Sequence, residues 1–364
     1  MRLLCLLVAL VPLALAKDLG IRFSKVLVDP RYNTSDIDLP LTSKHYPINK
    51  QNFQWLRKAI ASTVLIQRAC RECYWGFADL VDFAGGYPSH PSTEETNPFW
   101  GELAYVVKVQ TLRRQNVEPS TIMPLPDAWA NYTIAQVAEA VHDEFPGIHH
   151  IGLLSEWDKA KSIQIDRQVV PVVSSIDFLR GMVMLSDLVT WAIARVGPSD
   201  FALKWHVGMA RPAEVAYKIA SGEVTQGPPS SLVKSIKALN LSAATNFTAY
   251  PEGSPRHPSW PAMHSAASAA SLWMPVVMHM TPEQLCQVQL TDYAVAFART
   301  VAGVHYQADN MAGLKLGRQL IARFLPDYLN EKYGSSKAIV KAKIASLTFD
   351  WDDFLDSDCA KGLI

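Results

Sequence analysis

The chain has 364 residues, of which 49% are hydrophobic and 19% charged, and its 34 Lys and Arg balance its 34 Asp and Glu. This length and apolar content allow a substantial core in one large domain or two ordinary ones, and they exclude a disordered chain and a small disulfide-stapled peptide. Nucleic-acid binding normally requires a basic excess, so we expect no nucleic acid as a partner.

The first 16 residues have the order of a secretory signal peptide. Arg2 precedes an apolar run that extends to Leu15, and a small residue, Ala16, ends the segment. We therefore predict a signal peptide at 1–16 and a secreted mature chain that forms one domain at 17–364. No later segment reaches about 18 uninterrupted apolar residues, so we expect no membrane span.

Export would also affect the cysteines and the asparagines. After removal of the signal peptide four cysteines remain, which would allow two disulfides in any of three pairings: Cys70, Cys73, Cys286 and Cys359. The CxxC spacing of the first two also fits a redox or zinc site, but no second CxxC accompanies it, so we favour structural cysteines. Four Asn-x-Ser/Thr sequons would accept glycans in a eukaryotic host: Asn33, Asn131, Asn240 and Asn246.

Apolar residues recur at helical spacing along most of the chain, whereas strand-like alternation is scarce. The predicted helices span residues 51–73, 100–115, 134–144, 175–196, 231–239, 264–280, 281–301 and 310–325. Thr281 and Pro282 supply an N-cap and a first-turn proline for one of them. Small residues after His264 would let that helix lie close to its neighbours in the middle of a bundle. We predict a mainly α fold made of helical bundles.

Lys204 and Arg211 form the first candidate site segment. They lie seven residues apart, which is two helical turns, so a continuous helix would carry both cations on one face and break at Pro212. Alone, such a pair is usually a solvated stripe on a helix surface.

Two histidines mark the second segment. A proline-rich loop that begins at Tyr250 carries His257 and delivers His264 to the start of the small-residue helix. Backbone N–H groups at a helix start are unpaired and favour an anion. An isolated histidine at such a place more often caps the helix or packs in the core.

The third segment contains Arg299, His305 and Asp309. Arg299 and His305 are six residues apart, about 120° off a common helix face, so the chain must bend near Gly303 if both meet one ligand. Asp309 follows His305 by four residues and would either orient the imidazole or pair with Arg299. By itself the pattern also fits a buried histidine with a local acid.

Taken together, three cations and two histidines are the groups that a tetrahedral oxyanion site needs. The chain resembles vanadium-dependent haloperoxidases and the related type 2 phosphatidic acid phosphatase-like acid phosphatases in three segments of matching order and spacing: Lys204-x6-Arg211-Pro212, Pro261-x-x-His264 and Arg299-x5-His305. The resemblance covers residues 201–327, and the loop around His257 is most similar to the bromoperoxidase type. It implies a mainly helical fold with the cofactor between helices of two bundles.

The resemblance also implies a vanadate cofactor and a role for each matching residue. His305 would bond vanadium and Asp309 would support it, while three cations would compensate the charge of the vanadate oxygens: Lys204, Arg211 and Arg299. His264 would be the acid/base, His257 an extra histidine near the cofactor, and Lys204 would polarise hydrogen peroxide. The metal would act as a Lewis acid, and the oxidised halide would be released or passed to an organic acceptor.

The chain departs from the family pattern in two places. The usual Pro-Ser-Gly-His reads Pro261-Ala262-Met263-His264, so a hydroxyl is missing at Ala262, although the backbone N–H of Met263 still allows a cofactor contact. One lost hydrogen bond to a charged group costs about 1.5 to 3 kcal/mol. Met263 also places an oxidisable thioether beside a site that should handle peroxide. The seven-residue Lys–Arg separation is that of the chloroperoxidase and phosphatase members, which leaves the halide preference open.

Three functions follow from these residues. The leading hypothesis is a secreted vanadium-dependent haloperoxidase that oxidises bromide or iodide with hydrogen peroxide. The second is an acid phosphatase in which His305 attacks phosphorus to give a phosphohistidine and His264 protonates the leaving group. The third is an oxyanion-binding protein that lost efficient turnover through Ala262 and Met263. The organic acceptor and the oligomeric state stay open.

Overall fold

The structure is a computed structural model, and it describes residues 76–142, 149–150, 164–165 and 178–364. These residues form helices and loops, with one antiparallel pair of two-residue strands, β1 (Gln164–Ile165) and β2 (Met278–His279). The predicted mainly α fold is therefore confirmed. The predicted signal peptide, the helix at 51–73, Asn33, Cys70 and Cys73 lie outside the described residues.

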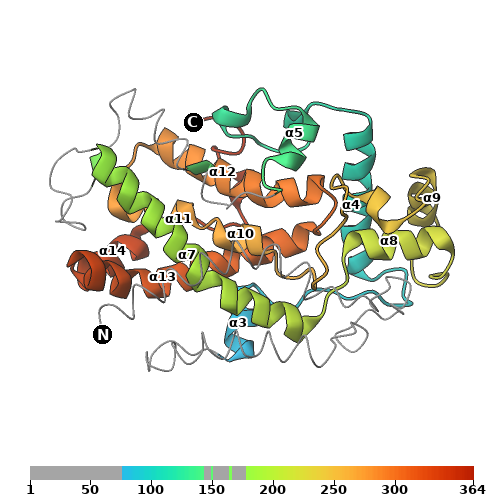
Figure 1. The fold of residues 1–364 in the computed structure, drawn as a ribbon, viewed down its shortest axis with the longest axis horizontal. Coiled ribbons are helices and arrows are strands. Elements are labelled where there is room, and N and C mark those ends of the chain that lie inside the picture. Colours follow the sequence, from blue (N-terminus) through green and yellow to red (C-terminus); the bar gives the residue numbers. More distant parts are fainter. Residues whose placement is uncertain (1–75, 143–148, 151–163, 166–177) are drawn as a thin grey trace.

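A short helix lies at the centre of the fold. This helix, α10 (Met263–Ala267), packs against α7 (Phe178–Val207), α12 (Pro282–Val301) and α13 (Gln307–Tyr333) (Figure 1). Gly313 and Gly317 of α13 face it, because a Cβ on Gly317 would lie 2.8 Å from the carbonyl carbon of Ala266. The small residues of α10 and these two glycines bring the two backbones together, as the sequence predicts for a helix in the middle of a bundle.

The remaining helices surround these four. In Figure 1, α4 (Pro98–Arg114), α8 (Pro212–Ser221) and α9 (Ser230–Ala238) lie at one end, and α14 (Lys337–Ser346) lies near the other. α5 (Ile134–Glu139) packs on α12, α3 (Phe77–Phe83) packs on α7 and α13, and α11 (Ala270–Val277) continues from α10. The described residues also include the 3₁₀ helices η2 (Pro119–Thr121), η3 (Asp127–Trp129), η4 (Ala244–Phe247) and η5 (Phe354–Asp356).

Most helix positions agree with the sequence prediction, and two helices are longer than predicted. α12 begins as expected, with Pro282 in its first turn and the Thr281 side chain accepting from the Gln284 amide at 3.3 Å. α7 continues past Pro198 to Val207, and α13 continues past Pro326 to Tyr333. Buried apolar residues follow each proline, Leu203 in α7 and Leu329 in α13, so core packing outweighs the local helix-breaking tendency.

The prediction of one continuous helix over 264–280 is wrong. The chain leaves helical geometry at Ser268 and Ala269, and α11 starts at Ala270. Asp292 of α12 is fully buried at this break, where it accepts from Ser268 Oγ at 2.9 Å and from the Ser271 amide at 2.8 Å. A carboxylate from another helix thus satisfies the amides that the break exposes, which is why the local sequence pattern does not reveal it.

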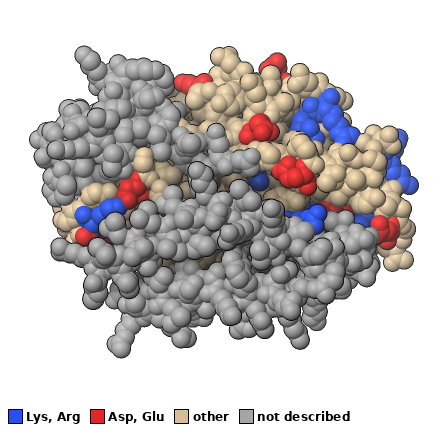
Figure 2. Space-filling view, viewed as in Figure 1, with Lys and Arg blue, Asp and Glu red and all other residues tan. Residues whose placement is uncertain are grey.

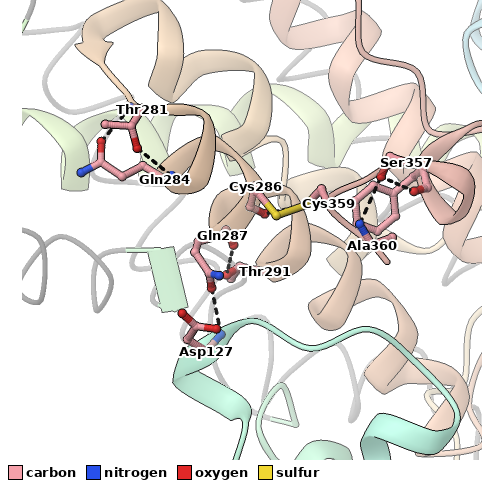
Figure 3. Close-up of a disulfide and its surroundings, with 10 residues drawn as sticks. Asp127, Thr281, Gln284, Cys286, Gln287, Thr291, Ser357, Cys359 and Ala360 are labelled. Carbon is pink, nitrogen blue, oxygen red and sulfur yellow. Dashed lines mark hydrogen bonds between the residues drawn. A yellow bond between two sulfur atoms is a disulfide. The ribbon is translucent and has the colours of Figure 1, made fainter. Parts of the chain in front are cut away.

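A disulfide attaches the C-terminal segment to α12. Cys286, in the second turn of α12, is joined to Cys359 across 73 residues of chain (Figure 3). The neighbouring Gln287 side chain accepts from the Asp127 amide at 2.8 Å, which links the same turn to η3. Of the three pairings that the sequence left open, the structure shows the one that joins Cys286 to Cys359, and the expectation for Cys70 and Cys73 falls outside the described residues.

The described surface carries both signs of charge, and Figure 2 shows Asp and Glu among the Lys and Arg of one face. Three sequon asparagines are exposed on the described surface: Asn131, Asn240 and Asn246. Glycosylation at these positions stays a prediction. Within the described ranges, no helix is long and apolar enough to cross a membrane.

Candidate functional site

The three predicted segments meet where α7, α8, α12 and α13 approach one another around α10. Lys204 lies in the last turn of α7, Arg211 is the N-cap of α8, and Arg299 lies in the last turn of α12. The expectation that Lys204 and Arg211 share one helix face is wrong, because α7 ends at Val207 and a turn at Gly208, with φ of 70°, separates the two residues. Pro212 therefore starts a helix and does not end one.

Arg211 is the centre of this arrangement and is fully buried. Its Nε donates to the His257 carbonyl oxygen at 3.0 Å, and Nη1 donates to the Val304 carbonyl oxygen at 2.7 Å. Nη1 also lies 2.9 Å from Nε2 of His305, and Nη2 lies 3.2 Å from Nδ1 of His257. One guanidinium thus joins the proline-rich loop to the turn between α12 and α13.

The arginine determines the protonation of both imidazoles. A guanidinium can only donate, so Nε2 of His305 presents a lone pair to it, whereas Nδ1 of His257 lies 3.2 Å from Arg211 Nη2 and also 3.2 Å from the Pro258 carbonyl oxygen. Burial lowers the pKa of both histidines well below the usual value, and the Arg211 charge lowers it further. Both rings are therefore neutral at pH 7, and His305 carries its hydrogen on Nδ1.

Asp309 orients His305. Its Oδ2 lies 3.1 Å from His305 Nδ1, and it also accepts from the Tyr306 amide at 3.0 Å and from the Ser259 hydroxyl. Burial raises the pKa of Asp309 to about 6, although the Ser259 hydrogen bond and the Lys204 charge oppose that shift. Of the two alternatives from the sequence, orienting the imidazole or pairing with Arg299, the described contacts show the first. The predicted bend is present, with Gly303 at φ of 80°.

Arg299 approaches the same region from α12. It is 3% exposed, and its Nη1 donates to the Val141 carbonyl oxygen and to the Tyr250 hydroxyl, both at 2.9 Å. The guanidinium carbon also lies 5.3 Å from the centre of the Tyr250 ring, and that hydroxyl donates to the Ala138 carbonyl oxygen at 2.9 Å. The Arg299 Nε is buried and has no hydrogen-bond partner in the part of the chain that the structure describes.

Lys204 is fully buried behind the proline-rich loop. Its Nζ donates to the Ser259 carbonyl oxygen at 2.8 Å and to the Pro261 carbonyl oxygen. Its pKa is lowered to about 8 by burial, which the nearby Asp200 carboxylate opposes. Lys204 therefore attaches the loop to α7 in addition to supplying a positive charge.

His264 and Met263 begin α10. His264 is half-buried and makes no hydrogen bond with the described residues, and burial together with the charges of Arg299, Lys204 and Arg211 lowers its pKa well below the usual value. The Met263 methyl group lies beside Gly197 of α7, where an added Cβ would be 3.3 Å away. Ala262 is fully buried, so a serine here would add a hydroxyl inside the site.

Three contributing residues were not predicted as site residues. Ser259 donates to Asp309 and its carbonyl oxygen accepts from Lys204. Tyr250 holds Arg299, and Asp200 lies one helical turn before Lys204. Ser259 follows His257 by two residues within the proline-rich loop, and this proximity is a signal from which its role could have been predicted. Asp200 also had one, since an acid four residues before a lysine pairs with it on a helix.

This arrangement suits a tetrahedral oxyanion. Three buried cations converge from three elements, and Arg299 keeps an unsatisfied N–H that an anion oxygen would accept. His305 is oriented by Asp309, and its Nε2 lone pair accepts from Arg211, so an oxyanion bonded at Nε2 would displace that arginine N–H onto its own oxygens. No group of three or more His, Cys, Asp or Glu side chains in the described ranges is arranged to hold a metal cation. The residues present therefore fit vanadate or phosphate, with the Ala262 contact missing.

No protein-family model matches this chain, and no curated protein matches it.

Proposed function

We propose that the chain is a secreted vanadium-dependent haloperoxidase that uses hydrogen peroxide to oxidise bromide or iodide. The observation that carries this proposal is the state of His305: its Nδ1–H is directed to Asp309 and its Nε2 lone pair faces a buried arginine. A histidine that merely filled the core would not need a buried acid on one nitrogen and a buried cation at the other.

Vanadate would be held by His305, by the charges of Lys204, Arg211 and Arg299, and by the Met263 backbone N–H. When bound, it supplies a Lewis acid that polarises peroxide and keeps its oxidation state. The chain's own contribution is proton transfer and charge. His264 is neutral at pH 7, because burial and three cations lower its pKa, so its imidazole accepts the proton that hydrogen peroxide loses.

The test is peroxide-dependent oxidation of bromide and iodide by protein stripped of anions, with and without added orthovanadate. We expect activity only with vanadate, competition by phosphate, and loss of activity in His305→Ala. His206→Ala is the matched control, because His206 lies on the outside of α7 against Phe77, with ring centroids 4.2 Å apart. Oxidation that is absent at saturating vanadate, or that persists in His305→Ala, would refute the proposal.

An acid phosphatase is the second candidate, and Met263 favours it. This thioether is half-buried next to His264, where a released oxidant would convert it to a sulfoxide, whereas phosphate transfer would leave it intact. In this reaction the His305 Nε2 lone pair would leave Arg211 and attack phosphorus, and His264 would give the leaving group a proton that it takes up from solvent in acid, because it is neutral at pH 7. Hydrolysis of an aryl phosphate that vanadate inhibits, without any halide oxidation by the same sample, would establish this function.

A further inference from the structure

Asp200 is a buried carboxylate that the proposed reaction does not use. It is fully buried on α7, one turn before Lys204, and its Oδ2 lies 3.7 Å from the lysine Nζ. Neither carboxylate oxygen has a hydrogen-bond partner within the described part of the chain. A buried charge without hydrogen bonds is costly, so Lys204 is what keeps Asp200 ionised.

Lys204 has only one hydrogen to share between Asp200 and a ligand. An ammonium has three N–H donors, and two of them go to the carbonyl oxygens of Ser259 and Pro261. The third can face Asp200 or an anion, but not both. An oxyanion that binds Lys204 would therefore remove the main stabilisation of the Asp200 charge.

Two other charges act on Asp200 in opposite directions, and a bound oxyanion would shift their balance. Arg211 at the start of α8 attracts the Asp200 carboxylate, while Asp309 of α13 repels it. A bound oxyanion would neutralise Arg211 and add negative charge beside both acids. A multiply charged anion beside two buried carboxylates favours protonation of one of them.

We propose that Asp200 is the internal counter-ion of the site and takes up a proton when an oxyanion binds. The inference rests on the oxyanion site of the proposed function, and it holds equally for vanadate and phosphate. The binding equilibrium then includes one proton from solvent: the anion accepts the third N–H of Lys204, and the carboxylate that loses this cation becomes a neutral carboxylic acid.

Protonation of Asp200 is accessible near neutral pH. Burial raises the pKa of Asp200 to about 7 even with Lys204 and Arg211 opposing the shift. A further rise on anion binding would place the group in its acid form at pH 7 to 8. Oxyanion affinity should accordingly fall as the pH rises above about 7, approaching tenfold per pH unit at the limit of one proton.

Infrared difference spectroscopy of tungstate binding tests the proposal directly. Tungstate is a tetrahedral dianion that does not titrate near neutral pH, so any proton taken up goes to the protein. We expect the C=O stretch of a protonated carboxylic acid to appear on tungstate binding in the wild type, and to be absent in Asp200→Asn. Because Lys204 has no carbonyl, its own titration cannot produce this signal.

Two further variants make the assignment specific. Asp187→Asn removes another carboxylate of α7, one that accepts from Tyr333 at 2.8 Å and lies outside the site, so the signal should remain. Asp200→Glu keeps a carboxyl group and should also retain it, which provides a second test if Asp200→Asn fails to fold. A wild-type spectrum without the signal, or one unchanged in Asp200→Asn, would overturn the proposal.

The outcomes also separate this inference from the proposed function. If tungstate does not bind the wild type, both fail. If tungstate binds with the Asp200 signal but vanadate supports no halide oxidation, the haloperoxidase function fails and the inference stands. If vanadate supports halide oxidation but tungstate affinity is constant from about pH 6 to about pH 8, the haloperoxidase function stands and the inference about Asp200 fails.

Discussion

The close contact between α10 and α13 predicts that a glycine-to-alanine substitution will destabilise the protein at Gly317 but not at Gly101. Gly317 of α13 faces the backbone of α10, where an added Cβ would lie 2.8 Å from the carbonyl carbon of Ala266, 3.0 Å from its Cα and closer still to its oxygen. Gly101 of α4 is exposed and would meet nothing within 4 Å. Gly317→Ala and Gly101→Ala therefore differ only in what the new methyl group touches.

The magnitude follows from these distances. Carbon atoms in ordinary contact are about 3.5 to 4.0 Å apart, so α13 must move from α10 by about 0.7 Å or more. All the atoms in the way belong to the backbone, and overpacking of this kind typically costs about 1 to 3 kcal/mol. At Gly101 the alanine only restricts the unfolded chain and favours the helix, which stabilises by up to about 1 kcal/mol. We expect the two variants to differ by about 1 to 4 kcal/mol in the free energy of unfolding.

Urea denaturation, followed by the helical circular dichroism signal, measures that difference. The midpoint for Gly317→Ala should lie below the wild-type value and that for Gly101→Ala at or above it. Tungstate affinity should fall in Gly317→Ala alone, because α10 begins with Met263 and His264. Equal midpoints for the two variants would refute the close approach of α10 and α13 and the account of the central helix that depends on it.

Three further predictions concern the site and the disulfide. Asp309→Asn should weaken vanadate binding by about 10- to 100-fold, because a neutral amide replaces the carboxylate that orients His305 through its Nδ1–H; equilibrium dialysis measures this, and unchanged affinity would contradict the assignment. Cys286→Ser or Cys359→Ser should lower the free energy of unfolding by about 2 to 5 kcal/mol in urea titrations, and a wild-type midpoint would show that the bond does not constrain the chain. His264 has a folded-state pKa well below 6.5, so the unfolded chain binds the extra proton in acid and stability falls as the pH drops through about 6.5. His264→Gln cannot take up that proton, so its stability relative to the wild type should rise by up to about 1.4 kcal/mol per pH unit between about pH 6 and about pH 5, and a constant difference would contradict the lowered pKa.

Local signals in the sequence predicted features that depend on neighbours in the chain. Thr281 and Pro282 start α12 as expected, because capping and first-turn preferences involve only adjacent residues. The bend at Gly303 was also predictable, since Arg299 and His305 lie on different helix faces unless the chain turns. These features bring the third segment of the site together.

Features that depend on distant partners were not predictable in this way. The break after α10 needs Asp292, which comes from another helix, and the placement of Lys204 and Arg211 on separate helices depends on the turn at Gly208. The proline-rich loop shows no periodicity, so its hydrogen bonds to Lys204 and Arg211 appear only in the structure. Residue spacing thus indicated the candidate cations, while tertiary contacts determined which main-chain groups they hold.

Two of the buried cations have both a structural and a ligand-binding role, and this affects how the protein can evolve. Lys204 and Arg211 bind main-chain carbonyl oxygens of the loop as well as providing charge for a ligand. Replacing either would leave buried carbonyl groups without donors, at a cost of about 1 to 3 kcal/mol for each group, which is a large share of the stability of a typical domain. Selection for folding alone would therefore preserve the signature cations, even in a descendant that had ceased to catalyse any reaction. The side chains of Ala262 and Met263 hold no such carbonyl groups, so these positions are under less constraint from folding, and they are the ones that differ from the pattern that the chain resembles.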